Sequence, residues 1–428
     1  MSPTREPRRV VVTGMGAVTS LGREVSSIWE AVVAGRSGVA QIRQFESGDF
    51  PVRIGSEVDL ESLQADPAAD LPRASRSAQF GVWALDRAWQ AAGLCETDFD
   101  PGRAGVCIGA STFPVVEDNL LNPMYILDGE HYNLDYYVEL CKQRPELLAQ
   151  RDIASISTLL AERKELRSAS MTVQTACASA TQAIGESFGV IHSGAADLMV
   201  TGGTDSMMTV LCVAGFTLVG TLSQRQDDPT RASRPFDLKR DGFVLGEGSG
   251  VVILEELEHA RRRGAPIHAE VMGYGSSSDG FRFTDVHPQG RGAIACMRSA
   301  LVNAGVEPQE VAYINAHGTG TVLNDPVETM AIKQVFGDHA YRLAVSSTKS
   351  QLGHLVCAAG GIEMILTVLA TEKGVLPPTI NLDQPDPDCD LDYVANECRR
   401  AEIDVALTNS FGFGGQNGTI VIRRWSGD

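Results

Sequence analysis

Short apolar runs rich in β-branched residues alternate along the chain with longer stretches in which apolar residues recur at helical spacing. Near the N-terminus, RRVVVTGMG predicts a buried strand, and VSSIWEAVVAG predicts a helix that ends at Gly35. The alternation continues through RAGVCIGAS, ADLMVTGGT, GVVILEELEHARRRG, IHAEVMGYG, AIACMRSALVNAGV, VAYINAHGTGT and DPVETMAIKQVFG. This order of strands and helices predicts an α/β protein with buried sheets.

Two distant segments share one design, in which an aromatic, Gly-rich loop leads into a strand of alternating Val and Ile. They are DGFVLGEGSGVVILEE, from Asp241 to Glu256, and NSFGFGGQNGTIVIRR, from Asn409 to Arg424. One lies near the middle of the chain and the other at its end, which predicts two similar halves, residues 1–264 and 265–428. The alternative is a chance likeness between two Gly-rich hairpins.

The segment from Pro114 to Asp152 breaks this alternation, because it is rich in Tyr, Leu and Asn and has no clean period. A long irregular stretch in a compact domain is usually a lid, a pocket wall or an interface. We therefore expect a cap or interface segment here.

The composition is that of a globular protein, with 43% apolar and 21% charged residues in a chain of 428, which exceeds one ordinary domain. No apolar run reaches the length of a membrane span, and no signal-peptide core follows the basic N-terminus, so we expect a cytoplasmic protein without a membrane segment. The net charge of −18 disfavours nucleic acid as a partner. The nine cysteines lack paired C-x-x-C spacing, which predicts reduced thiols and no metal site.

Cys177 lies in TACASA, just before apolar residues at helical spacing. A free cysteine is most often an inert, buried apolar residue. At a helix N-terminus, however, unpaired N–H groups and the helix dipole favour the thiolate, so we expect an ionised nucleophile beside its own backbone N–H.

Three further residues lie in turns among small side chains. His317 follows a predicted strand in NAHGTGT, and Lys349 and His354 are five residues apart in STKSQLGHLVCAAGG. A single histidine is more often structural than catalytic. Functional groups gather on strand-to-helix turns in α/β folds, however, so two such histidines favour a catalytic site.

Together, TACASA, NAHGTGT, KSQLGH and NSFGFGGQNG resemble the active-site motifs of the β-ketoacyl-acyl carrier protein synthases of the thiolase superfamily, and the elongating type II enzymes match best. The likeness covers nearly the whole chain. It implies a thiolase-like fold, in which two similar halves form a layered α-β-α-β-α core. It also implies a decarboxylative Claisen condensation of an acyl-enzyme with malonyl-carrier protein, without a cofactor beyond the carrier's phosphopantetheine. The pathway is fatty acid, polyketide or polyene biosynthesis.

The resemblance also implies roles for individual residues. Cys177 accepts the acyl group, and His317 and His354 stabilise the enolate. The backbone N–H groups of Cys177 and Phe413 form an oxyanion hole. Lys349 contacts Glu328, with Asp325 beside it, and this group organises the site electrostatically.

Phe413 lies between Gly412 and Gly414, and such a loop favours a mobile gate over the acyl pocket; a fixed core aromatic is the alternative. The chain departs from the family pattern at Gln416, where Thr is more frequent, and at Cys357, where a smaller residue is usual. Neither change removes a catalytic group.

The implied partner is acyl carrier protein, which is itself acidic, so we expect a local basic patch on this acidic chain. The candidates are Arg73, Arg76, Arg225 and Arg231, and ordinary surface charge is the equal alternative. The chain is expected to form a homodimer, or a heterodimer with a paralogue like a chain length factor. A thiolase acting on coenzyme A esters is a further alternative, but it needs a second cysteine in the C-terminal loop, where this sequence has none, which disfavours it. A non-catalytic partner subunit lacks the nucleophile, and the presence of Cys177 disfavours that alternative.

Overall fold

A computed structural model describes residues 7–48, 50–66, 74–111, 127–128, 131–143 and 152–427. Its centre is a ten-stranded sheet with the order β12-β11-β15-β16-β10-β1-β9-β8-β4-β7. The strands of the N-terminal half are β1 (Val10–Val18), β4 (Ala104–Ala110), β7 (Ser170–Val173), β8 (Leu198–Asp205) and β9 (Gly248–Glu256). Those of the C-terminal half are β10 (Ala269–Ser278), β11 (Val311–Asn315), β12 (Ala344–Ser346), β15 (Val405–Gly412) and β16 (Gln416–Arg424).

The two halves repeat one topology. In the N-terminal half, β1 pairs antiparallel with β9, β9 pairs antiparallel with β8, and β4 and then β7 extend the sheet in parallel. In the C-terminal half, β10 pairs antiparallel with β16, β16 pairs antiparallel with β15, and β11 and then β12 extend the sheet in parallel. The halves join where β1 and β10 run antiparallel, with Val10 opposite Val271 and Val12 opposite Ala269. The predicted fold class, an α/β fold of two similar halves, is therefore confirmed.

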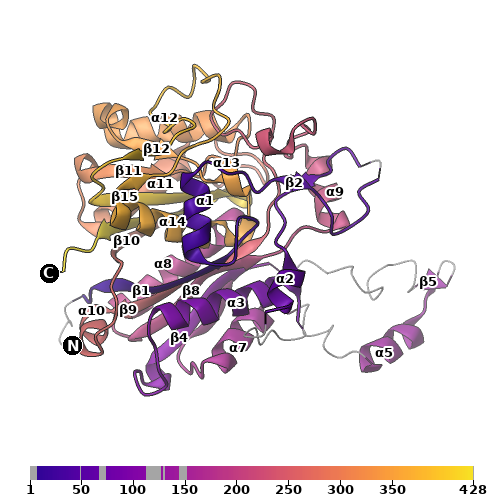
Figure 1. Cartoon of the computed structure of the whole chain (residues 1–428), viewed down its shortest axis with the longest axis horizontal. Coiled ribbons are helices and arrows are strands. Elements are labelled where there is room, and N and C mark those ends of the chain that lie inside the picture. Colours follow the sequence, from indigo (N-terminus) through magenta and orange to yellow (C-terminus); the bar gives the residue numbers. More distant parts are fainter. Residues whose placement is uncertain are drawn as a thin grey trace.

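Five layers result from this arrangement (Figure 1). Helices α8 (Ser179–His192) and α14 (Ala359–Lys373) lie between the two halves of the sheet, and each contacts strands of both. Helices α3 (Arg76–Ala91) and α7 (Ala154–Arg163) cover the outer face of the N-terminal half, and α11 (Arg291–Ala304) and α12 (Asn324–Phe336) cover that of the C-terminal half. The predicted α-β-α-β-α layering is confirmed.

Small residues allow the central helices to approach the strands closely. A Cβ added at Gly361 of α14 would lie 2.3 Å from the Gly250 carbonyl oxygen and 2.8 Å from the Gly203 amide nitrogen, both in the N-terminal half. A Cβ at Gly185 of α8 would lie within 2.4 Å of the Tyr274 ring, in the C-terminal half. At both glycines the helix contacts backbone atoms or an aromatic ring across the seam between the halves, and there is no room for a methyl group.

The chain was expected to carry a cap or interface segment at residues 114–152. Only β5 (Leu127–Asp128), β6 (His131–Tyr132), Asn133, α5 (Leu134–Gln143) and Asp152 of this segment are among the described residues. In Figure 1, β5 and α5 lie apart from the layered core. The cap stays a prediction, since most of the segment lies outside the described residues. Within the described part of the chain, every helix falls short of the length and apolar character that a membrane span requires.

Candidate active site

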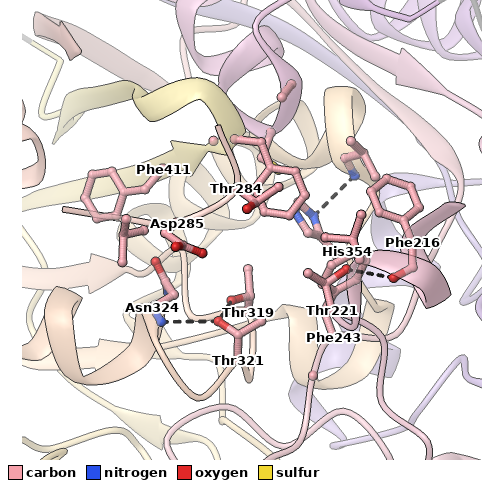
Figure 2. Close-up of a pocket in the computed structure, with 18 of the residues that line it drawn as sticks. Phe216, Thr221, Phe243, Thr284, Asp285, Thr319, Thr321, Asn324, His354 and Phe411 are labelled. Carbon is pink, nitrogen blue, oxygen red and sulfur yellow. Dashed lines mark hydrogen bonds between the residues drawn. The ribbon is translucent and has the colours of Figure 1, made fainter. Parts of the chain in front are cut away.

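A cavity of about 610 Å³ opens between the halves, at the end of the sheet where the predicted motif loops meet. The N-terminal half contributes Cys177 to its lining, and the C-terminal half contributes His317, His354 and Phe413. Figure 2 shows His354 beside Phe216 and Phe243, which form part of the apolar wall. The cavity thus gathers four residues that are distant in the sequence.

Cys177 lies in the 3₁₀ turn η2 (Ala176–Ala178), which leads directly into α8. Its sulfur, one ring nitrogen of His317 and one ring nitrogen of His354 all lie within 4.8 Å of one another. All three residues are buried, and among the described residues they are also the one trio of potential metal ligands close enough to share an ion. The sequence therefore predicted the central trio of side chains correctly as neighbours in space.

The prediction that Cys177 is ionised is wrong for the resting protein. Burial raises the pKa of Cys177 to about 11, although the backbone N–H groups of Phe413 and Cys177 and the nearby Lys349 cation favour the charged form. The helix N-terminus was identified correctly, but sequence gives no measure of desolvation, which outweighs it here. The thiol is therefore protonated at neutral pH. The two N–H groups expected to form the oxyanion hole both lie at the sulfur.

The two histidine rings meet edge to face, with centroids 5.4 Å apart and an interplanar angle of 82°. Burial lowers the pKa of both rings well below its usual value, and the Lys349 cation lowers it further, so both are neutral. His354 Nδ1 accepts the backbone N–H of Val356 at 3.2 Å, which places the ring proton on Nε2. That Nε2 has no hydrogen-bond partner among the described residues and is free to donate to a ligand.

Lys349 pairs directly with Glu363 of α14, and both side chains are almost fully buried. The expected partner, Glu328, instead accepts the backbone N–H groups of His317 at 2.9 Å and Gly318 at 2.8 Å. Burial raises the pKa of Glu328 to about 7. The predicted Lys349–Glu328 contact is therefore corrected to Lys349–Glu363. Glu363 was missed, although it is the single charged residue in the apolar run AGGIEMILTVLA.

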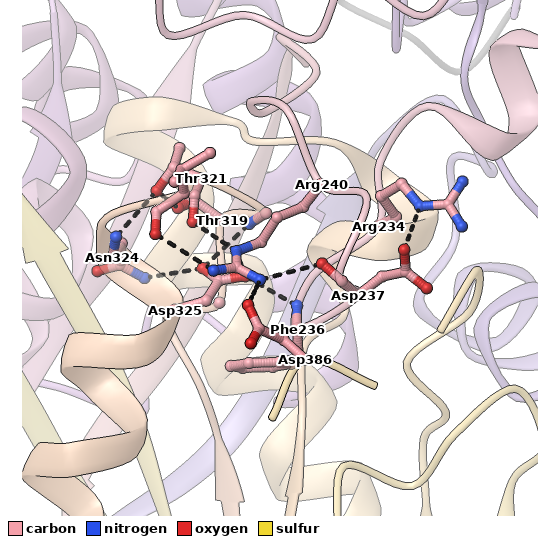
Figure 3. A network of polar contacts seen from close by, with 12 residues as sticks. Arg234, Phe236, Asp237, Arg240, Thr319, Thr321, Asn324, Asp325 and Asp386 are labelled. Carbon is pink, nitrogen blue, oxygen red and sulfur yellow. Dashed lines mark hydrogen bonds and ion pairs between the residues drawn. The ribbon is translucent and has the colours of Figure 1, made fainter. Parts of the chain in front are cut away.

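A buried polar network holds the loop after His317 (Figure 3). Asp325 accepts the backbone N–H groups of Gly320 at 3.2 Å and Phe236 at 2.8 Å, and Arg240 donates to the carbonyl oxygens of Thr321 at 2.9 Å and of Val322 at 3.2 Å. Asp325 therefore supports the site through the loop backbone. Arg240 was not singled out from the sequence, where nothing distinguishes it from a surface arginine.

Phe413 begins the turn η7 (Phe413–Gly415), lines the cavity and is half-buried. Gly414 has a φ of +76°, which suits glycine. Position 412 is glycine for a different reason: a Cβ there would lie 3.1 Å from the Cys177 amide nitrogen. The close approach to Cys177 thus accounts for Gly412, and the gate stays a prediction.

The four arginines predicted to form a basic docking patch differ in their surroundings, and the patch as a whole stays a prediction. Arg76 pairs with Glu247, which is fully buried and needs a counter-charge, so its assignment to docking is corrected. Arg231 is exposed and pairs with Asp383, Arg225 is half-buried, and Arg73 lies outside the described residues.

Comparisons with known proteins agree with this arrangement. Residues 7–260 match the family model described as the N-terminal domain of beta-ketoacyl synthase, and residues 268–383 match that of its C-terminal domain. Proteins named 3-oxoacyl-[acyl-carrier-protein] synthase 2 from Coxiella burnetii and from Synechocystis sp. are each 42% identical, over 98% of this chain and 99% of theirs.

Solved structures are similar as well. One is titled "AntDE:AntF (apo): type II PKS acyl-carrier protein in complex with its ketosynthase bound to the hexaketide"; it is 34% identical with a TM-score of 0.88, over 98% of this chain and 100% of that chain. A second is titled "The ishigamide ketosynthase/chain length factor"; it is 35% identical with a TM-score of 0.81, over the same shares.

Proposed function

The chain belongs to the β-ketoacyl synthase family of acyl-transferring, condensing enzymes, and from that premise we propose that Cys177, His317 and His354 are its catalytic groups. The observation that carries the proposal is the meeting of the thiol and both imidazoles within 4.8 Å, at one cavity between the two halves. The thiol supplies the nucleophile, and the neutral imidazoles donate hydrogen bonds without carrying a charge themselves.

In the first step, Cys177 attacks the carbonyl carbon of an acyl thioester. The bond to the carrier sulfur breaks, and the proton of the Cys177 thiol leaves with that sulfur as a carrier thiol. The negative charge that develops on the carbonyl oxygen is stabilised by the backbone N–H groups of Cys177 and Phe413, which already point at the sulfur. Losing one such donor costs about 2.7–4 kcal/mol of barrier.

In the second step, the malonyl thioester loses carbon dioxide, and the electron pair of the broken bond forms an enolate. His354 donates from Nε2 to the enolate oxygen, and His317 donates beside it. The enolate carbon attacks the acyl carbonyl and displaces the Cys177 sulfur. Because burial holds the pKa of this thiol at about 11, the released thiolate takes up a proton from the solvent and returns to the resting state.

Lys349 acts on the histidines through its charge. It lowers the pKa of both rings, so that they stay neutral during turnover, while Glu363 fixes its position and balances its charge. In this proposal neither residue transfers a proton. No step requires a metal ion or a redox cofactor.

The thioesters are proposed to arrive on an acyl carrier protein. The support is the solved ketosynthase whose title names an acyl-carrier protein in complex with it, at 34% identity over 98% of this chain. The length of the acyl chain is set by the apolar wall, to which Met207, Cys212 and Phe216 contribute.

A second possibility concerns the partner subunit. The solved ishigamide protein is titled as a ketosynthase with its chain length factor, and another neighbour, 27% identical, is titled in the same terms. This favours the chain as the active half of a heterodimer in polyketide or polyene biosynthesis, whereas the curated relatives favour an autonomous enzyme of fatty acid biosynthesis. Condensation by the chain purified alone would identify it as autonomous.

Mass spectrometry after incubation with acyl- and malonyl-carrier protein tests the catalytic assignment. Cys177→Ala is expected to give no acyl adduct, while Cys212→Ala, which changes another cysteine of the same cavity, is expected to keep the adduct. His317→Ala is expected to keep the adduct and to slow condensation about 100-fold or more. An adduct on Cys177→Ala, or normal product formation by His317→Ala, would refute the assignment.

A further inference from the structure

A second cysteine occupies the turn of the C-terminal half that corresponds to the Cys177 turn. It is Cys357, in the 3₁₀ turn η6 (Val356–Ala358), which leads into α14 as η2 leads into α8. Both turns begin with a residue other than glycine that has a positive φ, 49° at Ala176 and 46° at Val356, and in both the cysteine comes next. The internal repeat therefore places a second thiol at the position equivalent to that of the nucleophile.

The two turns lie against each other across the seam between the halves. Cα atoms of η2 and η6 approach within 8 Å of one another, and a Cβ added at Gly360 of α14 would lie 2.8 Å from the Thr181 amide nitrogen of α8. The Cys357 thiol forms a hydrogen bond with the Ser179 hydroxyl, and that hydroxyl closes the Cys177 turn by donating to a turn carbonyl at 2.6 Å. The Cys357 side chain therefore contacts the turn that carries the nucleophile.

Both thiols also reach the same cavity. In the described part of the chain, three cysteines line it, Cys177, Cys212 and Cys357, and all three are buried. Cys212 lies on α9 (Val210–Val219), whereas the other two lie on the paired turns. A small molecule that enters the cavity thus meets Cys177 with Cys357 next to its turn.

Cys357 is poorly equipped to hold an acyl group itself. Two backbone N–H groups point at the Cys177 sulfur, whereas the backbone N–H of Cys357 donates to the Asp205 carboxylate at 2.9 Å. An acyl group on Cys357 would therefore lack this donor for its oxyanion, and the carboxylate would oppose the negative charge. A bond between two sulfurs needs no oxyanion donor, only thiols whose backbones lie close together.

We propose that Cys177 and Cys357 form an oxidation site, at which a hydroperoxide converts the two thiols into a disulfide that reversibly blocks acylation. The block rests on the proposed function of Cys177, whereas the disulfide itself does not. Cys357 stands where the chain departs from the family pattern, so the site belongs to this chain and not to the shared mechanism.

The oxidation takes two steps. The Cys177 sulfur attacks one oxygen of the hydroperoxide, the O–O bond breaks, and the thiol proton leaves with the other oxygen as water or an alcohol. The product is a sulfenic acid on Cys177. The Cys357 sulfur then attacks the Cys177 sulfur, the S–O bond breaks, and the hydroxide leaves as water with the Cys357 proton. Two electrons pass from the two sulfurs to the peroxide.

The surroundings of the two thiols determine this order. The Lys349 cation and two backbone N–H groups favour the anion of Cys177, whereas the Asp205 carboxylate raises the pKa of Cys357 further. Cys177 is thus oxidised first and Cys357 resolves the sulfenic acid. Because burial raises the pKa of both thiols, little thiolate is present at neutral pH and the oxidation is slow.

Mass spectrometry of the full chain tests the site. The protein is treated with excess hydrogen peroxide, its remaining thiols are blocked, and the monomer band of a denaturing gel without reductant is digested. We expect a linked pair of peptides that joins Cys177 to Cys357 and separates with dithiothreitol. A link from Cys177 to Cys212, or a sulfinic acid on Cys177 with no link to Cys357, would overturn the proposal.

Recovery of activity tests the role of Cys357. After peroxide, dithiothreitol is expected to restore at least about fivefold more of the starting condensation activity in the wild type than in Cys357→Ala, whose sulfenic acid proceeds to sulfinic acid. Cys357→Ser, which keeps a polar group beside Ser179, is expected to behave as Cys357→Ala does.

Cys212→Ala is the matched control, since it removes another thiol of the same cavity, and its recovery is expected to equal that of the wild type. Each variant is compared with its own activity before oxidation. Equal recovery in the wild type and in both Cys357 variants would overturn the proposal. Failure of the unoxidised wild type to form an acyl adduct would instead refute the proposed function, and the linked peptides would still report on the disulfide.

Discussion

Asp205, at the end of β8, is a buried carboxylate close to the acyl cavity, with 1% of its surface exposed. It accepts hydrogen bonds from the Ser111 hydroxyl at 2.6 Å and from the backbone N–H groups of Ser206 and Cys357, each at 2.9 Å. Burial nevertheless raises its pKa to about 6. Three donors thus compensate only part of the cost of removing a carboxylate from water.

This shift makes the stability of the protein depend on pH in a predictable direction. The pKa is about 6 in the folded chain, against 3.8 for an ordinary aspartate in water, as in the unfolded chain, so the folded state binds the proton more tightly. The contribution of Asp205 to stability is therefore present in acid and is lost as the pH rises through about 6. In Asp205→Asn this dependence is absent. The free energy of unfolding of the variant minus that of the wild type is expected to rise by about 1.4 kcal/mol between about pH 5 and pH 7.5.

Urea unfolding at several pH values measures that difference. The lost carboxylate also changes hydrogen bonds to Ser111 and Cys357, but that effect is nearly constant with pH and does not alter the slope. A difference that stays flat, or that falls as the pH rises, would contradict the assigned pKa.

The sequence predicted where the motif residues lie when their location depends on neighbouring residues in the chain. His317 and Cys177 were placed correctly because each lies at a turn beside a strand or a helix start. The protonated state of Cys177 and the pairing of Lys349 with Glu363 could not be predicted, because they depend on desolvation and on contacts across 14 residues of folded chain. Arg76 looked like surface charge for the same reason, since its partner Glu247 is 171 residues away.

At the scale of elements, the loop between β11 and α12 is held by hydrogen bonds to backbone groups along its length. Glu328 accepts the N–H groups of His317 and Gly318. The Ser347 hydroxyl donates to the Gly318 carbonyl, and the Gly242 N–H donates to the Gly320 carbonyl. Arg240 completes the set at the far end of the loop. The loop is thus rigid where it carries His317 and where it reaches the cavity opening.

Arg240→Lys tests how the loop affects substrate binding. Lysine keeps the charge, but its single nitrogen cannot donate to both loop carbonyls and to Asp386 as the guanidinium does. We expect the KM for carrier substrates to rise about fivefold or more, because the end of the loop bears Val322 and the Thr321 hydroxyl. We expect kcat to stay within about threefold of the wild-type value, because Glu328 still anchors His317.

Arg234→Lys is the control for a purely structural effect. Arg234 is equally buried in the same network and pairs with Asp237 and Asp383, but none of its hydrogen bonds reaches the loop. Its replacement is expected to lower the thermal midpoint while leaving KM unchanged. Equal effects of both substitutions on KM would show that the loop contact has no specific role.

The sequence predicted most of the main strands and helices, because their apolar periods are regular, and the likeness of two Gly-rich hairpins predicted the repeat. It did not give the strand order by itself. Pairing of β1 with β10 joins residues that are about 260 positions apart, and only the packed structure contains that contact. The gate at Phe413, predicted from its flanking glycines, and the cap at residues 114–152, predicted from the irregular sequence there, both stay predictions.

At the scale of the whole molecule, the reaction depends on how the two halves meet. Cys177 comes from the N-terminal half, whereas both histidines, Lys349 and Phe413 come from the C-terminal half. The central helices α8 and α14 determine the spacing of these groups, since α8 begins just after Cys177 and α14 carries Glu363. A small change in the seam between the halves therefore reaches the active site.

Gly361→Ala is the sharpest test of that dependence. Its Cβ would meet backbone atoms of Gly250 and Gly203 at 2.3 and 2.8 Å, and strand backbone cannot rotate away as a side chain can. We expect a loss of about 3 kcal/mol in the free energy of unfolding, at the upper end for an overpacked core. The kcat for condensation is expected to fall as well, because α14 must shift and takes Glu363 with it. Urea unfolding and condensation assays measure the two effects.

Gly189→Ala is the matched control, because Gly189 is also helical, lies in α8 and has open space where its Cβ would be. There the methyl group only reduces backbone freedom, so a gain of about 0.5–1 kcal/mol is expected, with unchanged kcat. A stable, fully active Gly361→Ala would mean that the halves tolerate a wider seam and that their spacing does not control the chemistry. A lower kcat in both Gly361→Ala and Gly189→Ala would mean that altered helix dynamics, not the spacing of the halves, lowers kcat, since Gly189 does not lie in the seam.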